Sequence, residues 1–164
     1  MKAYVKCLCC VAFLVVSTGV SIGDTKIDGQ VVANNVKLKG KTRIEINGQS
    51  QVSAGCNDKD AEITVWIDGG AGNGKGPSKL TVAGKCKKLV IERQNGQTTI
   101  DARELVAEEV LVKDMNGQTT LYVNTADMTV ENMDGQSHIY FKKYSATKPL
   151  IELNQGGING QSTV

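Results

Sequence analysis

The tripeptide Asn/Asp-Gly-Gln occurs six times along this chain of 164 residues. The glycines at the centres of the copies are Gly29, Gly48, Gly96, Gly117, Gly135 and Gly160. A seventh copy, Asp68-Gly69-Gly70, lacks the glutamine. A motif that returns in this way indicates a fold made of one small unit stacked on itself.

The spacing of these glycines gives the length of the unit. Successive glycines are 18 to 27 residues apart, and most intervals are close to 20. The two longest intervals contain residues 69–78, which are rich in glycine, and residues 142–149. Because neither segment has the pattern of a strand, we expect an inserted loop near each of them.

Apolar or small residues alternate with polar ones on both sides of each glycine. Two residues before it stand Ile27, Ile46, Ile67, Gln94, Met115, Met133 and Ile158. Two residues after it stand Val31, Ser50, Ala71, Thr98, Thr119, Ser137 and Ser162. Four after it stand Ala33, Val52, Ile100, Leu121, Ile139 and Val164, and Asn73 in the unit with the glycine-rich segment breaks the rule. A period of two is typical of a strand with one buried face. The glycine therefore marks a corner between two short strands, where a positive φ is expected.

A strand, a glycine corner, a second strand and a return strand within one unit describe one coil of a parallel β-helix. We predict an all-β, single-domain β-solenoid of about seven coils, roughly 20 residues each, stacked roughly 4.8 Å apart. The stacked glutamines are then expected to form an amide ladder along the solenoid. The alternative is an antiparallel sandwich or barrel, which would not require the same residue at every corner.

The first residues have the features of a secretory signal peptide. A basic start is followed by an apolar run over residues 8–16 and by small residues at 21–23. We expect residues 1–23 to be removed before Asp24 and residues 24–164 to form the β-helix domain of an exported protein, in the periplasm, at the cell surface or outside the cell. An uncleaved anchor is the alternative. The rest of the sequence has no second long apolar stretch, so no transmembrane segment is expected after cleavage.

The charge of the exported part argues against nucleic acid as a partner. Two of the 19 basic residues, Lys2 and Lys6, lie in the leader, so 17 remain against 17 acidic residues. Nucleic-acid binding needs a concentrated positive surface. Only the short cluster Lys85, Lys87 and Lys88 comes near this description, and it is more typical of a solvated edge.

Two cysteines remain after the leader, Cys56 and Cys86. Their contexts, Ala-Gly-Cys and Ala-Gly-Lys-Cys, are similar and suggest equivalent places on neighbouring coils. Since an exported chain with an even number of cysteines usually oxidises them, we expect a disulfide. Two buried free thiols are the alternative. A structural metal site needs about four ligands, so none is expected.

The residues give little support to catalysis, and we expect neither an enzyme nor a cofactor. His138 is the only histidine, and its neighbour Ser137 faces the opposite side of a strand. Asp101, Glu108 and Glu109 are the acids that a polysaccharide-cleaving enzyme could use, but no long groove is predicted around them. Polysaccharide cleavage is therefore the least favoured alternative.

Aromatic residues favour binding instead. Tyr122 and Tyr140 both stand five residues after their glycines, so they should stack outward on adjacent coils. His138 is expected on the same face, and Trp66 also points outward beside the glycine-rich loop. Adjacent tyrosines suit a sugar ring or a partner protein. The alternative is that these aromatics only stiffen an exposed sheet.

Self-assembly is a second expectation. Residues 162–164 begin a strand after the last corner, and no capping helix follows them. An open end of a β-helix presents unpaired backbone groups that can recruit another strand. End-to-end homo-oligomers are therefore the alternative to a module that binds a separate partner.

Two families resemble the repeat. Glu45-Ile46-Asn47-Gly48-Gln49-Ser50 and Gly157-Ile158-Asn159-Gly160-Gln161-Ser162 are similar to the head GIN domain, which is assigned to the adhesin heads of exported bacterial proteins. Lys26-Ile27-Asp28-Gly29 resembles the corners of the bactofilins, cytoskeletal polymers with β-helix coils. The resemblance implies a non-enzymatic structural or adhesion-type module and supplies no catalytic residues.

Overall fold

The computed structural model describes residues 3–6, 14–17, 21–22, 24–28, 31–69, 76–125, 127–141, 150–153 and 158–164. All regular secondary structure in these residues is β-strand. The strands are β1 (Ala3–Lys6), β2 (Leu14–Ser17), β3 (Ser21–Ile22), β4 (Thr25–Asp28), β5 (Val31–Leu38), β6 (Lys41–Asn47), β7 (Ser50–Asn57), β8 (Glu62–Asp68), β9 (Ser78–Val112), β10 (Met115–Thr125), β11 (Asp127–Val130), β12 (His138–Phe141) and β13 (Leu150–Leu153).

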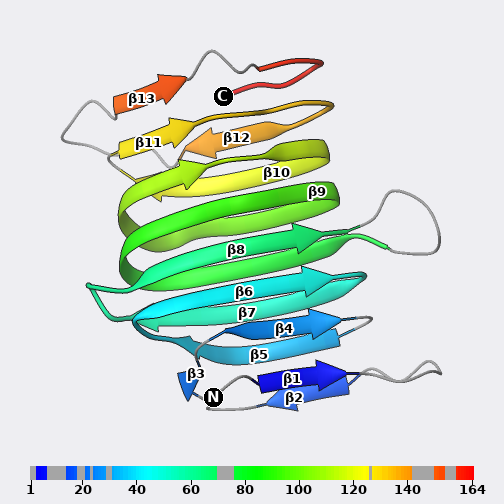
Figure 1. Cartoon of the computed structure of the whole chain (residues 1–164), viewed down its shortest axis with the longest axis vertical. Coiled ribbons are helices and arrows are strands. Elements are labelled where there is room, and N and C mark those ends of the chain that lie inside the picture. Colours follow the sequence, from blue (N-terminus) through cyan, green and yellow to red (C-terminus); the bar gives the residue numbers. More distant parts are fainter. Residues whose placement is uncertain are drawn as a thin grey trace.

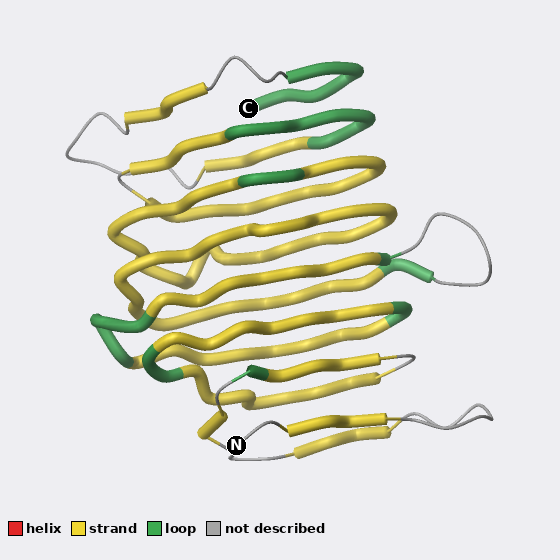
Figure 2. The backbone as a smooth tube through the Cα atoms, in the orientation of Figure 1, coloured by secondary structure: helices red, strands yellow, loops and turns green. Residues whose placement is uncertain are grey.

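The strands wind into a parallel β-solenoid of about five turns (Figure 1). β4, β6 and β8 pair in one layer, and β5 and β7 pair in the layer behind it (Figure 2). The long strands β9 and β10 bend around corners and contribute to both layers. The predicted parallel β-solenoid is confirmed, whereas the count of seven coils is not confirmed.

The column two residues before the corner glycine is stacked as the sequence predicts. Its successive partners are Ile27 with Ile46, Ile46 with Ile67, Ile67 with Gln94, Gln94 with Met115, Met115 with Met133 and Met133 with Ile158. All of them except Ile158 are buried between the two layers. Equal positions of the repeat therefore lie on one another, and each buried methylene contributes about 0.8 kcal/mol.

Gln94 is the polar member of this buried column. Its side chain is 0 % exposed. The Nε2 atom donates hydrogen bonds to the backbone oxygens of Thr120, at 2.9 Å, and of Thr98, at 3.3 Å. Its Oε1 atom has no hydrogen-bond partner. Since a buried polar atom is costly unless it is paired, Gln94 is a weak point of the core.

The predicted positive φ is present at five corner glycines, namely Gly48, Gly96, Gly117, Gly135 and Gly160. Gly69 is an exception without a positive φ, and Gly29 lies outside the described residues. The sequence pattern missed Gly84, where φ is +111° and an added Cβ would lie 1.8 Å from the backbone oxygen of Cys56. Only glycine fits there, because the backbones of neighbouring coils touch.

The expected amide ladder runs along the glycine corners. Gln97 Nε2 donates to Gln118 Oε1 at 3.0 Å, and Gln118 Nε2 donates to Gln136 Oε1 at 3.2 Å. Gln136 Nε2 then donates to Gln161 Oε1 at 3.2 Å. Each central glutamine thus donates to one neighbour and accepts from the other. Gln30 lies outside the described residues.

The structure corrects the alignment predicted for the unit that contains the glycine-rich segment. β8 ends at Asp68 and β9 begins at Ser78, where the side-chain hydroxyl donates to the backbone oxygen of Gly48. Leu80 pairs with Val52, so Leu80 holds the inward position at which Asn73 broke the sequence pattern. Ser78, two residues before Leu80, is buried as Ser50 is, and Ala71 lies outside the described residues. An alignment on the glycine cannot show where the chain returns to the sheet.

Residues of the expected leader also contain strands. β1 pairs with β4, β2 pairs with β5, and β3 pairs with the end of β5 (Figure 1). Removal of residues 1–23 stays a prediction. Among the described residues no helix is long and apolar enough to cross a membrane.

The expected disulfide is absent from the structure. Cys56 and Cys86 are both buried free thiols. The register pairs Cys56 with Gly84, so Cys86 lies two residues beyond the partner of Cys56. Similar local sequence therefore did not place the two cysteines at equivalent positions, because Gly55 pairs with Ala83 and not with Gly84, and Lys85 adds a further residue before Cys86. Burial raises the pKa of both thiols, that of Cys86 to about 12.

Candidate functional site

The outer side of the layer that contains β7, β10 and β12 carries the two tyrosines that the sequence singled out, Tyr122 and Tyr140. Within β10 the side chains of Leu121 and Val123 are buried, so Tyr122 between them points away from the core. The same alternation in β12 leaves Tyr140 48 % exposed next to buried Ile139. Tyr122 pairs in register with Tyr140.

The two tyrosine rings are stacked. Their centroids are 5.2 Å apart, and their planes differ by 20°. Such an offset pair is worth about 0.5–1.5 kcal/mol beyond the area that it buries. The pair also leaves the face of Tyr140 available to a flat, partly apolar ligand.

A charged pair borders the tyrosines on the preceding coil. Asp101 pairs in register with Tyr122. Arg103 holds the Asp101 carboxylate with two hydrogen bonds, from Nε at 2.8 Å and from a terminal nitrogen at 2.6 Å. This contact with Arg103 is the main cause that lowers the pKa of Asp101. The Arg103 guanidinium also lies 4.8 Å from the ring centre of Tyr122.

Arg103 was missed by the sequence interpretation, although a signal was present. Arg103 is two residues after Asp101 and therefore faces the same side of the strand. The structure thus joins Arg103, Tyr122 and Tyr140 in one row across three coils. We call Asp101, Arg103, Tyr122, His138 and Tyr140 the tyrosine face.

His138 lies at the edge of the tyrosine face. Its ring is 6.2 Å from that of Tyr140, and its Nδ1 atom is 2.7 Å from Thr163 Oγ1. It has no serine or carboxylate partner among its hydrogen bonds in the described part of the chain. His138 therefore lies beside Tyr140 at the edge of the face, with one ring nitrogen in contact with Thr163.

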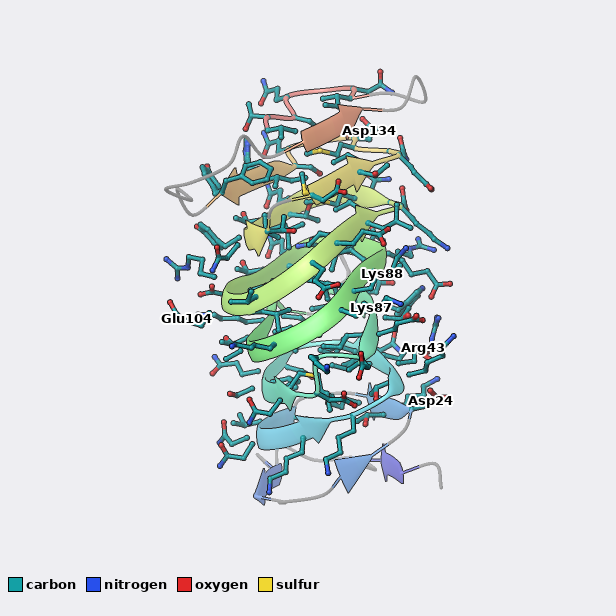
Figure 3. All side chains as sticks on the ribbon, turned by 90° about the vertical axis from the view of Figure 1, so that its left-hand side faces the viewer. Asp24, Arg43, Lys87, Lys88, Glu104 and Asp134 are labelled. Carbon is teal, nitrogen blue, oxygen red and sulfur yellow. The ribbon has the colours of Figure 1, made fainter. Side chains whose placement is uncertain are left out.

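Trp66 does not join the tyrosine face. It lies in β8, in the opposite layer, where it pairs with Glu45 on one side and Arg93 on the other. The Arg93 guanidinium is 5.7 Å from its ring centre. Figure 3 shows the two opposite sides of the solenoid, with Arg43 and Lys88 on one side and Glu104 on the other. A single small ligand cannot touch Trp66 and Tyr140 together.

A recess lies lower on the same outer side as the tyrosine face. It has a volume of about 710 Å³ and is bordered by residues of β5, β7 and β9. Its floor is low because Lys37 pairs with Gly55 and Gly55 pairs with Ala83, so two successive coils carry almost no outward side chain. A second hollow of about 340 Å³, lined by Thr81, Asp101, Arg103 and Glu104, connects this region to the tyrosine face.

Two of the acids that a polysaccharide-cleaving enzyme could use, Asp101 and Glu109, are held in ion pairs. Asp101 is bound to Arg103, and Glu109 accepts a hydrogen bond of 2.5 Å from Lys88. The same ion pair occupies one lysine of the Lys85, Lys87 and Lys88 cluster. Among the described residues no group of three or more His, Cys, Asp or Glu side chains could hold a metal ion.

Comparisons with protein-family models, with curated proteins and with solved structures found no match to this chain. The functional proposal therefore depends on the residues and on their geometry.

Proposed function

We propose that this protein is a non-enzymatic, exported structural or adhesion-type module that binds a glycan on the tyrosine face. The observation that carries the proposal is the stacked pair of Tyr122 and Tyr140 on adjacent coils of a rigid solenoid. An exposed aromatic ring offers the apolar face of a sugar a flat partner, and neighbouring polar groups can bind its hydroxyls.

The surroundings of the tyrosines favour a glycan over a protein partner. Thr120 and His138 pair in register beside the tyrosine column, and they offer hydroxyl and imidazole groups. Among the residues whose burial the structure describes, the exposed large apolar side chains are Val106, Tyr140, Ile158 and Val164. Only Tyr140 of these belongs to the tyrosine face, whereas a stable protein interface usually has an apolar centre. Binding of a protein is the competing outcome of the test below.

The test is a glycan array, with a pull-down from the host or target surface as its second arm. The Tyr122→Ala/Tyr140→Ala variant should bind any glycan found about tenfold more weakly or worse. Trp66→Leu removes an aromatic from the opposite layer and should bind as the unchanged protein does. If the double variant keeps full binding, the tyrosine face is not the site.

End-to-end self-assembly is the second candidate. It is supported by Ile158 and Val164, which are 40 % and 44 % exposed on the same coil. Light scattering of the purified protein should then show size growing with concentration, and Ile158→Ser/Val164→Ser should reduce it. A monodisperse particle at all concentrations excludes this candidate.

Three further features belong to the proposal. The seven copies of the glycine motif support seven coils of roughly 20 residues. The leader supports export, and the repeat supports kinship with head GIN domains or, more remotely, bactofilins. Mass determination of the secreted protein tests the cleavage before Asp24.

A further inference from the structure

The recess over Gly55 and Ala83 has the charge of an anion-binding site. Lys37 and Lys39 are exposed at its border, and none of the residues that line it is acidic. Within the described residues neither lysine forms a salt bridge. Lys39 is close enough to Asp58 to contribute to the lowered pKa of that carboxyl, but the main causes are hydrogen bonds from the backbone N–H groups of Gly40 and Asp60.

Polar groups suited to hydroxyls complete the recess. Asn35 and Ser53 line it with an amide and a hydroxyl. Asn35 has a φ of 60° and belongs to an irregularity of β5 between Ala33 and Val36. No aromatic residue lines it. An amide and a hydroxyl at the recess can bind the hydroxyls of a polyhydroxylated ligand, and apolar residues such as Ala54 and Ala83 also line it.

The recess is unsuited to a peptide that adds to a sheet edge. β7 pairs with β5 on one side and with β9 on the other, so its backbone groups are occupied by the ladder. Addition of a strand needs a free edge. A ligand over Gly55 in β7 must therefore bind through side chains.

The recess and the tyrosine face lie on one continuous surface. Ala83 lines the recess, and Thr81, two residues earlier on β9 and facing the same way, lines the hollow that contains Asp101 and Arg103. Four steps between coils separate Gly55 from Tyr140, about 19 Å at the usual strand spacing. A chain of several sugars could lie along this path.

We propose that the recess is a second subsite that selects an acidic glycan, whose carboxylate or sulfate groups bind Lys37 and Lys39 while another part of the chain covers Tyr140. This inference rests on the proposed function, which supplies the class of ligand, and it adds that the ligand is negatively charged. Exposed ion pairs are weakened by salt, so the preference for an acidic glycan is expected at low and moderate ionic strength.

The experiment compares polymers that differ in charge. The purified protein is titrated with polygalacturonate, with its fully methyl-esterified form, with heparin and with polyglutamate. At low salt the protein should bind polygalacturonate or heparin about fivefold or more tightly than the uncharged ester, since two exposed charge contacts contribute this much together. Polyglutamate should bind no better than the ester.

Two variants test the recess itself. Lys37→Gln/Lys39→Gln should abolish the preference for the acidic polymer, and Gly55→Gln should fill the recess with the same result. Gly55 suits this substitution because an added Cβ meets no atom within 4 Å. Lys87→Gln/Lys113→Gln removes the same charge outside the recess and should preserve the preference.

The outcomes separate the two proposals. Equal binding of both polygalacturonate forms, or a preference that survives both recess variants, overturns the acidic subsite while a loss in Tyr122→Ala/Tyr140→Ala still supports the proposed function. Binding of polyglutamate as tight as that of the acidic glycans also overturns it, because the site would then select charge without sugar. No binding of either acidic glycan at low salt overturns it as well.

Discussion

Gly135 lies directly over Gly117, and a β-carbon built on Gly135 would lie 2.8 Å from the backbone oxygen of Gly117. The same contact recurs between Gly160 and Gly135, at 2.6 Å. The corners therefore stack backbone on backbone, and a side chain would push neighbouring coils apart. This contact explains why the repeat keeps glycine at the centre of its motif.

Substitution of a corner glycine should be costly. Gly135→Ala places a side chain at a φ of +73° and against the Gly117 backbone, so we expect a loss of about 2–4 kcal/mol of unfolding free energy. Gly55→Ala is the matched control, because its Cβ would meet nothing within 4 Å and its φ is not positive. Urea unfolding followed by circular dichroism measures both, and similar midpoints would contradict the stacking argument.

The amide ladder should contribute a measurable amount of stability. Gln118→Leu removes one hydrogen bond to Gln97 and one to Gln136, and we expect a loss of about 1 kcal/mol because the ladder is exposed to water. Gln51→Leu changes an exposed glutamine outside the ladder and serves as the control. Chemical unfolding curves of the two variants should differ, with Gln118→Leu the less stable one.

The two buried cysteines should behave as protected thiols. Without reductant, a thiol-specific alkylating reagent at pH 8 should leave Cys56 and Cys86 of the native protein unmodified, because both are buried and their pKa values are raised. After unfolding in guanidinium, peptide mapping should find both residues alkylated. Resistance to alkylation in the unfolded protein until a reductant is added would show a disulfide instead.

Cys86 should make the stability fall at alkaline pH. Burial raises its pKa from 9.0 to about 12, so the folded protein keeps a proton that the unfolded chain releases between these values. The contribution is complete below pH 9 and is lost as pH rises towards 12, by up to about 1.4 kcal/mol per pH unit. Cys86→Ala should show a flatter decline over this window. Equal slopes of stability against pH in the two proteins would contradict the assignment to Cys86, since the other groups that titrate between pH 9 and 12 are common to both.

Trp66 should report unfolding but not binding. It is the single tryptophan and lies in the layer opposite the tyrosine face. Its fluorescence should therefore change when urea unfolds the solenoid, and should stay constant when a glycan binds at Tyr140. Calorimetry on the same samples confirms that binding has occurred. A shift of its emission on addition of the ligand would indicate that the ligand binds to the layer of Trp66, and would contradict binding at Tyr140.

The fold could be predicted because its information is local. Alternation around the glycines identifies the inward residues, and a recurring corner requires coils in register. Ile46 on Ile67 and Gln97 on Gln118 follow from these two facts alone. Tyr122 on Tyr140 follows in the same way, since both occupy one position of the unit.

The errors occurred where the unit changes length. The insertion before Ser78 displaced the register, so Leu80 fills the inward position at which Asn73 broke the sequence pattern. Because Gly55 pairs with Ala83 and Lys85 adds a further residue, Cys86 lies two residues beyond the partner of Cys56. Sequence spacing cannot show where an irregular coil rejoins the sheet, because that depends on which backbone groups find partners.

The sequence by itself determined the parallel solenoid, its glycine corners and the outward column of tyrosines, because a side-chain period of two and a repeated corner leave few other ways to bury the apolar residues. Only the tertiary structure decided that Trp66 faces away from Tyr140, that Arg103 lies beside Tyr122, and that Lys37 lies at the border of the recess at Gly55. These relationships depend on which layer each segment enters and on which coil lies beside it, and they arise only when the chain has closed around its core.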